Sequence, residues 1–373
     1  MIIRVLTRKV ESAGRPTATV TSAPPDPIAT PLPYSAVMSD NEPVSTRASR
    51  PWWRKKRYRF LMVLVLLVGF GYLNNSSLLV ATPQEPPLLL AHRGVAQTFD
   101  MTDVDGDTCT AEIIDTPTHD LLENTIDSIA AAFDAGADLV EFDVHITADD
   151  RFAVFHDWEL DCRTDGTGTT RDHTMAQLKQ LDIGYGYTAD GGATFPFRGE
   201  GVGLMPSMEE VLTEFPEQPL LMHIKSDDPR EGQVLAERLA HLPDSRLELL
   251  TVYGGDAPIE QLRERMPGLR VMSKDIMMSC LLQYELYSWT GIVPEVCRNT
   301  QLHVPEGYAP LLWGWPVRFV DRMASVDTRV VLVAGSGDWS EGFDTVESLS
   351  RIPEGYTGLI WTNRITDIVG SVR

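Results

Sequence analysis

From Leu88 onwards, short apolar runs with the length of strands alternate with segments in which apolar residues recur at helical spacing. The strand-like runs are Leu88–Ala91, Leu139–Ile146, Phe152–Phe155, Leu220–Ile224, Leu247–Val252, Leu269–Met272, Val330–Val333 and Leu359–Trp361. The helical segments are Thr125–Ala135, Ser207–Phe215, Glu231–Leu242, Ile259–Met266 and Val317–Ser325. Since repeated strand–helix units connect parallel strands, the alternation predicts an α/β fold with a parallel sheet.

Several of these runs end in acidic, histidine or lysine residues, and a (β/α)8 barrel places its active site at the carboxyl ends of its strands. No Gly-x-Gly-x-x-Gly follows the first run, which argues against a dinucleotide-binding sheet. We therefore predict a (β/α)8 TIM barrel with insertions over residues 82–373. The strand count between Asp275 and Thr328 stays open, because this long stretch reads as an insertion.

An apolar segment precedes the predicted barrel. Residues 60–81 are apolar except for Asn74-Asn75-Ser76-Ser77, and only the whole segment reaches the roughly 20 residues that a spanning helix needs. Basic residues of the preceding flank, Trp52–Arg59, favour the cytoplasmic side, and its aromatic residues favour the interface. We predict an uncleaved single transmembrane helix within residues 52–81, with the following domain periplasmic or extracellular. The alternatives are a cleaved signal peptide and a buried soluble helix.

Charge is divided unevenly along the chain. Residues 1–59 hold 11 Lys and Arg against 4 Asp and Glu, whereas the remainder holds 21 against 49. An acidic main domain repels nucleic acid, so we expect no nucleic-acid partner. Residues 1–51 are rich in Pro, Ser, Thr and Ala without apolar periodicity and are predicted to be disordered, with Met38 as an alternative start.

The four cysteines are Cys109, Cys162, Cys280 and Cys297, and their spacings match no zinc motif. An even number in an exported domain indicates two disulfides. Three pairings are open, among them a local Cys280–Cys297 bridge together with Cys109–Cys162.

Glu141 and Asp143 lie two residues apart in a strand, so both side chains point to the same face. Adjacent carboxylates repel unless a positive charge lies between them, and a hard divalent cation with oxygen ligands meets this need. Glu123 can join the pair if its loop lies at the same end of the barrel. These residues form a candidate metal site.

His92 and His156 each follow a strand-like run, and a charged residue follows each of them. Cleavage of a phosphodiester needs one group that activates the nucleophile and another that protonates the leaving alcohol, and histidine does both near neutral pH. Arg93 and Lys225 can supply positive charge to the phosphoryl group.

Four blocks in this order, His92-Arg93-Gly94, Glu123-Asn124-Thr125, Glu141-x-Asp143 and His156-Asp157, resemble the signature of the glycerophosphodiester phosphodiesterase family. The resemblance continues through Thr164–Gly168, Leu181–Gly184, Pro206–Leu212 and Ile224-Lys225, and it weakens beyond residue 226.

The resemblance implies a barrel that hydrolyses small-molecule glycerophosphodiesters to sn-glycerol 3-phosphate and an alcohol with Ca²⁺ or Mg²⁺. By the same resemblance, Glu123, Glu141 and Asp143 hold the metal. His92 and His156 are the catalytic acid and base, and Arg93 and Lys225 bind phosphate.

This chain departs from the family at His223, where the family usually has a glutamate that binds the metal. His223 can serve as a nitrogen ligand, leave the metal one ligand short, or shift the preference toward a softer ion. Two alternative functions stay open: phospholipase D-like action on phospholipids or lysophospholipids, which exposed Trp313 and Trp315 at the barrel mouth would favour, and a non-catalytic lipid or metal sensor.

Overall fold

The computed structural model describes residues 52–101, 104, 108–336 and 341–373. The segment 1–51, predicted to be disordered, lies outside the described residues. The chain divides into two units, residues 1–68 and residues 69–373, of which the second contains the whole barrel.

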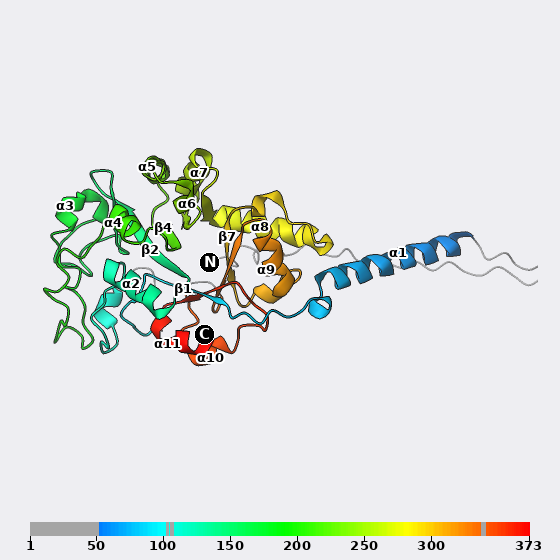
Figure 1. The fold of residues 1–373 in the computed structure, drawn as a ribbon, viewed down its shortest axis with the longest axis horizontal. Helices are drawn as coiled ribbons and strands as arrows, with labels where there is room; N and C mark the ends of the chain where they lie inside the picture. Colours follow the sequence, from blue (N-terminus) through cyan, green and yellow to red (C-terminus); the bar gives the residue numbers. More distant parts are fainter. Residues whose placement is uncertain (1–51, 102–103, 105–107, 337–340) are drawn as a thin grey trace, which may run out of the picture. The chain divides into compact units, whose positions relative to one another are not determined.

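Eight parallel strands form the barrel, in the order β6-β5-β4-β2-β1-β9-β8-β7 (Figure 1). Their bounds are β1 Leu88–Ala91, β2 Leu139–Ile146, β4 Leu220–Ile224, β5 Leu250–Gly254, β6 Arg270–Ser273, β7 Gln301–Pro305, β8 Arg329–Val333 and β9 Leu359–Thr362. No strand ladder joins β6 to β7, two strands that are described in full, but the hydroxyl of Thr300 donates to the carbonyl of Val271 at 2.6 Å across this gap. The predicted parallel barrel is confirmed as a nearly closed one.

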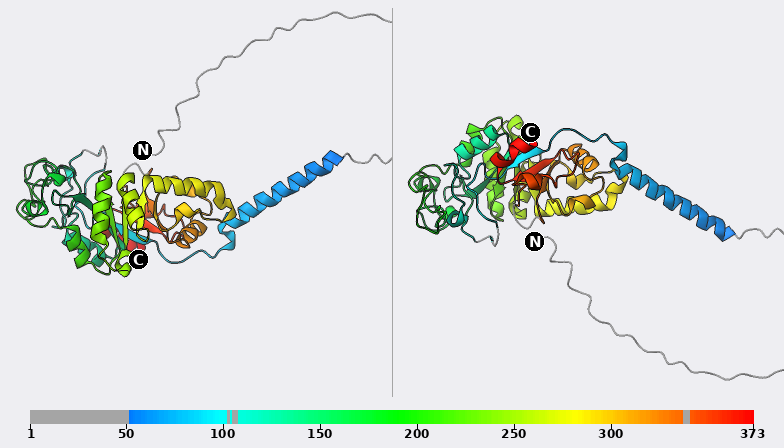
Figure 2. Two further views of the ribbon diagram at one scale, coloured as in Figure 1. Left: turned by 90° about the horizontal axis from the view of Figure 1, so that it is seen from above. Right: turned by 90° about the horizontal axis from the view of Figure 1, so that it is seen from below.

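Helices surround the barrel and follow most of its strands (Figure 2). The longer ones are α2 Ile126–Ala135, α4 Met208–Glu214, α5 Pro229–Leu239, α7 Asp256–Arg265, α8 Lys274–Tyr287, α9 Val317–Ala324 and α11 Ile365–Val372, and α3 Met175–Leu178, α6 Asp244–Leu247 and α10 Val346–Leu349 are single turns. Local chemistry fixes their ends. Thr125 and Ser128 form a capping box at the start of α2, and Gly136 ends the helix with a φ of 111°.

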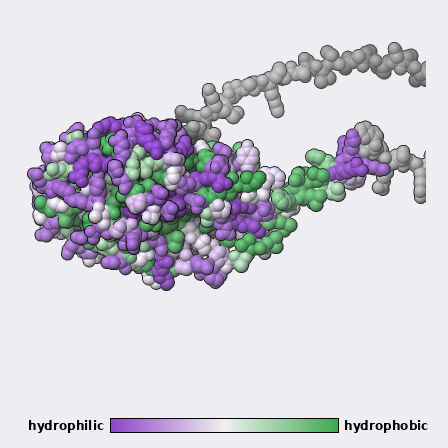
Figure 3. Space-filling view, turned by 45° about the horizontal axis from the view of Figure 1, so that its top comes forward, coloured by the Kyte–Doolittle hydropathy of each residue, from purple (hydrophilic) through white to green (hydrophobic). Residues whose placement is uncertain are grey.

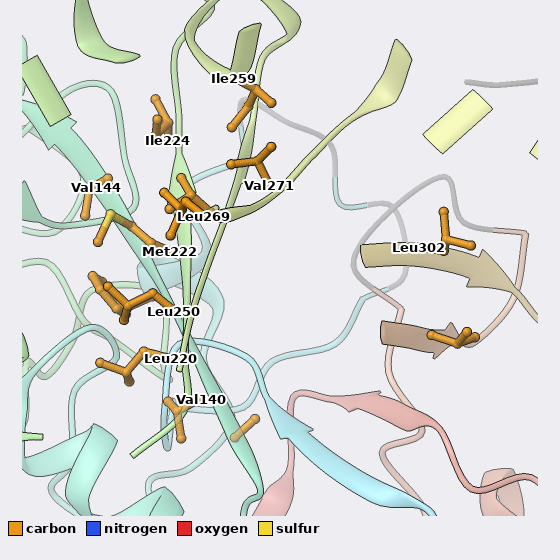
Figure 4. Close-up of a cluster of buried hydrophobic side chains, with 14 of the residues drawn as sticks. Val140, Val144, Leu220, Met222, Ile224, Leu250, Ile259, Leu269, Val271 and Leu302 are labelled. Atoms are coloured by element: carbon orange, nitrogen blue, oxygen red, sulfur yellow. The ribbon is translucent and has the colours of Figure 1, made fainter. Parts of the chain in front are cut away.

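The main core lies between the strands and the surrounding helices. Figure 4 shows part of it, where Val140 and Val144 of β2 lie beside Leu220 and Met222 of β4, and Ile259 of α7 lies near Val271 of β6. All these side chains are fully or almost fully buried. Residues of the opposite parity on the same strands point into the barrel, so each strand is buried on both faces.

Two strands differ from the sequence prediction. The run at Phe152 forms β3 (Phe152–Val154), but β3 pairs antiparallel with the end of β2 and is not a barrel strand. The strand missing from the predicted set is β7, which completes the eight strands of the barrel. It lies between Asp275 and Thr328, where the strand count was left open. Its residues Gln301 and His303 face the barrel interior, so the strand lacks the apolar pattern that identifies the others.

Both disulfides belong to the barrel unit. Cys109 pairs with Cys162 and Cys280 pairs with Cys297, which excludes the other two arrangements. Cys109 and Cys162 pack against a second apolar cluster, built by residues 111–205 over the cavity end of the barrel, which includes Phe155, Leu160 and Tyr187.

Helix α1 (Trp52–Asn75) contains a stretch, Lys55–Asn75, that is long and apolar enough to cross a membrane. Length and composition alone identify this stretch as a candidate span.

Candidate active site

The strand register brings the predicted site residues to one end of the barrel interior. Asp143 of β2 pairs with His223 of β4, which pairs with Tyr253 of β5. These side chains share the inward parity of Leu221 and Leu139, which lie one and two layers deeper in a small apolar cluster inside the barrel. The polar layer therefore rests on an apolar floor, at the carboxyl ends of the strands.

A cavity of about 1100 Å³ opens over this layer. Its lining includes the residues predicted to act on the substrate, namely His92, Arg93, Glu123, Asp143, His156, His223 and Lys225. Loop residues 96–101 and 156–162 form much of its wall. One cavity thus collects side chains from His92 to Arg364, which lie 272 positions apart in the sequence.

Glu141 and Asp143 are buried side by side on β2. Glu141 accepts hydrogen bonds from the Tyr253 hydroxyl at 2.8 Å and from the backbone N–H of Arg93 at 3.1 Å. Burial, and then the charge of Asp143, raises the pKa of Glu141 to about 8. Burial also opposes ionisation of Asp143, but Lys225 at 3.5 Å leads the positive neighbours that hold its pKa well below the usual value.

One ligand atom from each of Glu141, Asp143 and His223 lies within 4.8 Å of the others. The Nδ1 atom of His223 is 2.9 Å from Asp143 and 3.8 Å from Glu141. Burial lowers the pKa of His223 to about 4, so its ring is neutral and can donate a lone pair. Two buried carboxylates whose charges repel, beside a neutral imidazole, fit a divalent cation.

Glu123, the remaining predicted metal ligand, lies outside this group. Its two oxygens contact Arg93 at 2.9 Å and Arg163 at 3.4 Å. Burial opposes ionisation of Glu123, but these arginines, Arg163 foremost, lower its pKa. The same Arg93 side chain is 3.3 Å from Asp143, so a guanidinium group bridges Glu123 and the acidic pair.

His92 has a defined tautomer. Its Nδ1 atom is 2.6 Å from Oδ1 of Asn363, whose amide nitrogen donates to Asp344 at 2.8 Å. This orients the amide so that its oxygen faces the ring, and Nδ1 of His92 therefore carries the proton. The Nε2 atom is then an acceptor, 3.1 Å from Nε of Arg93. Burial, and then Arg93, lowers the pKa of His92 well below its usual value, so the ring is neutral.

His156 reaches the same layer by a different route. Strand β3 turns back along β2, and the N–H of Phe155 donates to the carbonyl of Asp143 at 3.1 Å, which sets the depth of the next residue. Nδ1 of His156 is 2.6 Å from Asp157, and Asp157 accepts from Arg163 at 2.8 Å. Burial and Arg93 lower the pKa of His156, whereas the bond to Asp157 opposes this shift.

The sequence prediction missed several residues that hold this layer in place. Asn124 bonds both ways with Asp143, at 3.1 Å through its amide nitrogen and at 2.9 Å through its oxygen. Tyr253 stacks on His223 with ring centroids 4.1 Å apart. Arg163 follows Cys162 directly, and its side chain is 4% exposed. A signal existed only for Asn124, which lies inside the Glu123-Asn124-Thr125 block.

Comparisons with known proteins agree with this arrangement. A model of the "Glycerophosphoryl diester phosphodiesterase family" matches residues 92–247, which include every histidine, acid and cation described above as a predicted site residue. Residues 92–247, less than half of the chain, are therefore similar to this family. The match begins at His92 and ends before β5, so it does not include strands β5 to β9.

The glycerophosphodiester phosphodiesterase of Bacillus subtilis is 38% identical over 96 residues, which are 25% of this chain and 31% of that enzyme. The chain thus spans about a third of the length of that relative. An uncharacterized protein of Mycobacterium tuberculosis is 25% identical over 231 residues, 61% of this chain and 68% of that protein.

Among solved structures, the phosphodiesterase domain of an uncharacterized M. tuberculosis protein superposes with a TM-score of 0.55 at 19% identity. The superposition covers 78% of this chain and 100% of that domain. The fold of that domain is therefore similar to the fold of most of this chain.

Proposed function

We propose that this domain hydrolyses glycerophosphodiesters to sn-glycerol 3-phosphate and an alcohol, with a divalent metal and with His92 and His156 as base and acid. The observation that carries the proposal is the single cavity lined by both histidines, by Arg93 and Lys225, and by the acidic pair's Asp143. Phosphodiester cleavage needs a base, an acid and positive charge together. The names of the family and of its Bacillus subtilis member give the substrate class.

Glu141, Asp143 and His223 would hold the metal, which is Ca²⁺ or Mg²⁺ in our proposal. Glu123 becomes a fourth ligand only if its carboxylate leaves Arg93. A bound cation would polarise a phosphoryl oxygen and offset charge in the transition state. The nitrogen ligand His223 widens the range of usable metals toward Mn²⁺ or Zn²⁺, because imidazole suits softer ions better than carboxylate does.

The two histidines have different surroundings, which suggest their roles. Neutral His92 presents a lone pair at Nε2, because Asn363 fixes its proton at Nδ1, so it takes the proton of the nucleophile. His156 is backed by the carboxylate of Asp157, which favours the protonated ring, so it gives a proton to the leaving alcohol. Arg93 and Lys225 bind the phosphate oxygens. The nucleophile is either water or the substrate's own 2-hydroxyl, which would pass through a cyclic phosphate.

We further propose that α1 is a transmembrane anchor and that the barrel lies outside the cytoplasm, in the periplasm or the extracellular space. Basic residues flank the amino-terminal end of the candidate span, and such residues stay on the cytoplasmic side. Two disulfides suit an oxidising compartment.

Phospholipase D-like action has less support. Trp313 and Trp315 do not line the cavity, and Trp315 packs against the main core. The alternative of a non-catalytic lipid or metal sensor requires that the cavity binds its ligand without hydrolysing a substrate. The assay of sn-glycerol 3-phosphate release described next tests this alternative as well.

The test is release of sn-glycerol 3-phosphate from glycerophosphocholine by the full-length chain in detergent, with Ca²⁺, Mg²⁺, Mn²⁺ or EDTA. We expect metal-dependent release that falls at least about 100-fold in His92→Ala. His241→Ala, at an exposed position, is the matched control. No release with any metal, from a folded chain that binds metal, would refute the proposal.

The assignment of base and acid has its own test. A glycerophosphodiester with p-nitrophenol as the leaving group needs no protonation of that group. We expect His156→Ala to recover most of its activity on this substrate, whereas His92→Ala stays inactive. Equal recovery in both variants would contradict the assignment.

A further inference from the structure

One end of the barrel unit carries an exposed apolar surface that plays no part in the cavity. Its residues, called here the junction face, are Leu282, Leu286 and Tyr287 of α8, Ile292, Leu311 and Trp313. Their exposure ranges from 38% for Trp313 to 72% for Leu311. Figure 3 shows hydrophobic surface at this end, which lies on the right in Figures 1 and 3.

The exposed side of α8 changes character along its length. Near its start the exposed residues are polar or charged, as at Lys274, Asp275 and Ser279. Near its end they include Leu282 and Leu286, one turn apart on the same side. Trp313 joins them, because its indole N–H donates to the carbonyl of Glu285 at 3.0 Å. Apolar side chains gathered on one exposed surface mark an interaction site rather than ordinary surface.

The last residues of α1, which belong to the barrel unit, are fastened to this same end. The side-chain amides of Asn74 and Asn75 donate to the carbonyl of Trp289 at 3.1 and 2.9 Å. Phe70 meets the Trp289 ring edge-on, with centroids 6.4 Å apart. Trp289 follows α8 by two residues, so the end of the candidate span lies beside the carboxyl end of α8, which carries Leu286 and Tyr287 of the junction face.

Two arginines of α9 complete this attachment. Arg322 donates to the carbonyl of Asn74 at 3.1 Å and to the side chain of Asn75 at 2.8 Å, and Arg318 donates to the carbonyl of Ser76 at 2.9 Å. The last carbonyls of a helix lack partners within the helix and carry partial negative charge, which cations stabilise. The α1 terminus is therefore capped by the barrel itself.

The junction face lies at the opposite end of the barrel from the cavity. Helix α8 begins directly after β6, at the carboxyl end where the cavity opens, and its 14 residues extend about 21 Å toward the other end. The chain from α8 then leads into the first residue of β7. Figures 1 and 2 show α8 running away from the loops around α3, which lie at the cavity end.

We propose that the junction face lies in the interface of the lipid bilayer and holds the cavity pointing away from that bilayer. The inference rests on the proposed anchor and deepens the proposed function. Tyr and Trp favour the interface, where apolar rings and polar groups are both accommodated. A cavity that faces the aqueous side takes water-soluble diesters from solution and does not reach phospholipids in the membrane that holds the protein.

The test places labels on the full-length chain in phosphatidylcholine vesicles. All four native cysteines are in disulfides, so Leu286→Cys and Ile292→Cys each add one reactive thiol for a bimane label. Val202→Cys is the matched control, since Val202 is also apolar and exposed but lies in the loops at the cavity end. Circular dichroism checks that each variant is folded, independently of its activity on glycerophosphocholine.

We expect brominated lipid to quench the labels at 286 and 292 at least about threefold more than the label at 202, and iodide in solution to show the reverse order. Equal iodide quenching at all three positions, or lipid quenching at 202, would overturn the inference. Hydrolysis of the vesicle phosphatidylcholine would overturn it as well. An inactive chain with the expected quenching would refute the proposed function alone, whereas a chain that carbonate strips from the vesicles would refute the anchor and this inference together.

Discussion

Replacing Arg163 with methionine tests how far the cavity wall depends on one buried charge. The guanidinium is 2.8 Å from Asp157, 3.4 Å from Glu123 and 2.7 Å from the Tyr187 hydroxyl. Methionine fills much of the same space without the charge, so both carboxylates remain buried without this partner. Removing one partner of a buried ion pair costs about 3–5 kcal/mol, and we expect a loss of this size in the free energy of unfolding at pH 7.

The loss should depend on pH in a defined direction. Burial raises the pKa values of Asp157 and Glu123, and Arg163 is the neighbour that lowers both of them most. Both pKa values therefore lie below their usual range. A carboxylate whose pKa is lower in the folded state adds stability above its unfolded pKa of about 4 and loses it as the pH falls through the folded value. The stability deficit of the variant should be complete at pH 7 and should shrink below pH 4.

Urea unfolding of the full-length chain in micelles, followed by circular dichroism at pH 7 and pH 3.5, measures both effects. Arg298→Met is the control, because the Arg298–Glu295 pair is 53% and 86% exposed and should contribute less than about 1 kcal/mol. A deficit below 1 kcal/mol for Arg163→Met at pH 7, or an equal deficit at both pH values, would refute the reasoning.

Three further predictions concern the residues that position the site. Tyr253→Phe removes the hydroxyl that donates to Glu141 and should weaken metal binding about 10- to 100-fold at pH 7. Calorimetry should show a smaller deficit at pH 9, above the pKa of about 8 at which Glu141 loses its competing proton. Tyr356→Phe, whose hydroxyl bonds only backbone carbonyls in the described structure, should leave the affinity unchanged. Asn363→Ala frees the His92 ring and should lower kcat about 10- to 100-fold with little change in KM, as steady-state kinetics would measure. Asn363→Asp should instead move the acidic limb of the pH–rate profile upward, because a carboxylate stabilises the protonated imidazole; an unchanged limb would contradict the assigned contact.

The sequence predicted those parts of the site that follow from residue parity on one strand. Glu141 and Asp143 are two apart, and both point into the barrel beside His223, as alternation on a strand requires. Parity is a local property, so a single strand sufficed to predict it. The roles of these residues as metal ligands stay predictions.

Residue parity did not predict the direction of β3 or the polar residues that β7 places inside the barrel. The apolar run at Phe152 has the composition of a barrel strand, yet it folds back antiparallel, because a run of three or four residues does not encode its direction. The opposite error hid β7, where Gln301 and His303 occupy inward positions inside the barrel. An apolar pattern identifies strands only where the interior is apolar.

Contacts between residues far apart in the sequence were also out of reach. Glu123 was assigned to the metal on the basis of its block, but in the structure its oxygens contact Arg93 and Arg163, 30 and 40 positions away. The disulfides are a similar case, since four cysteines allow three pairings and only spatial proximity selects one.

The direction of the strand–helix unit would separate the two tasks proposed for this chain, hydrolysis in the cavity and attachment to a membrane. Each strand ends where the cavity opens, and each following helix returns to the other end of the barrel, so residues at a strand's carboxyl end and at the next helix's carboxyl end lie on opposite sides. His223 illustrates the first position, in β4, and Tyr287 the second, at the end of α8. A chain that attaches at the second position leaves the cavity unobstructed, and a substitution at the junction face should therefore change membrane contact without changing kcat on a soluble diester.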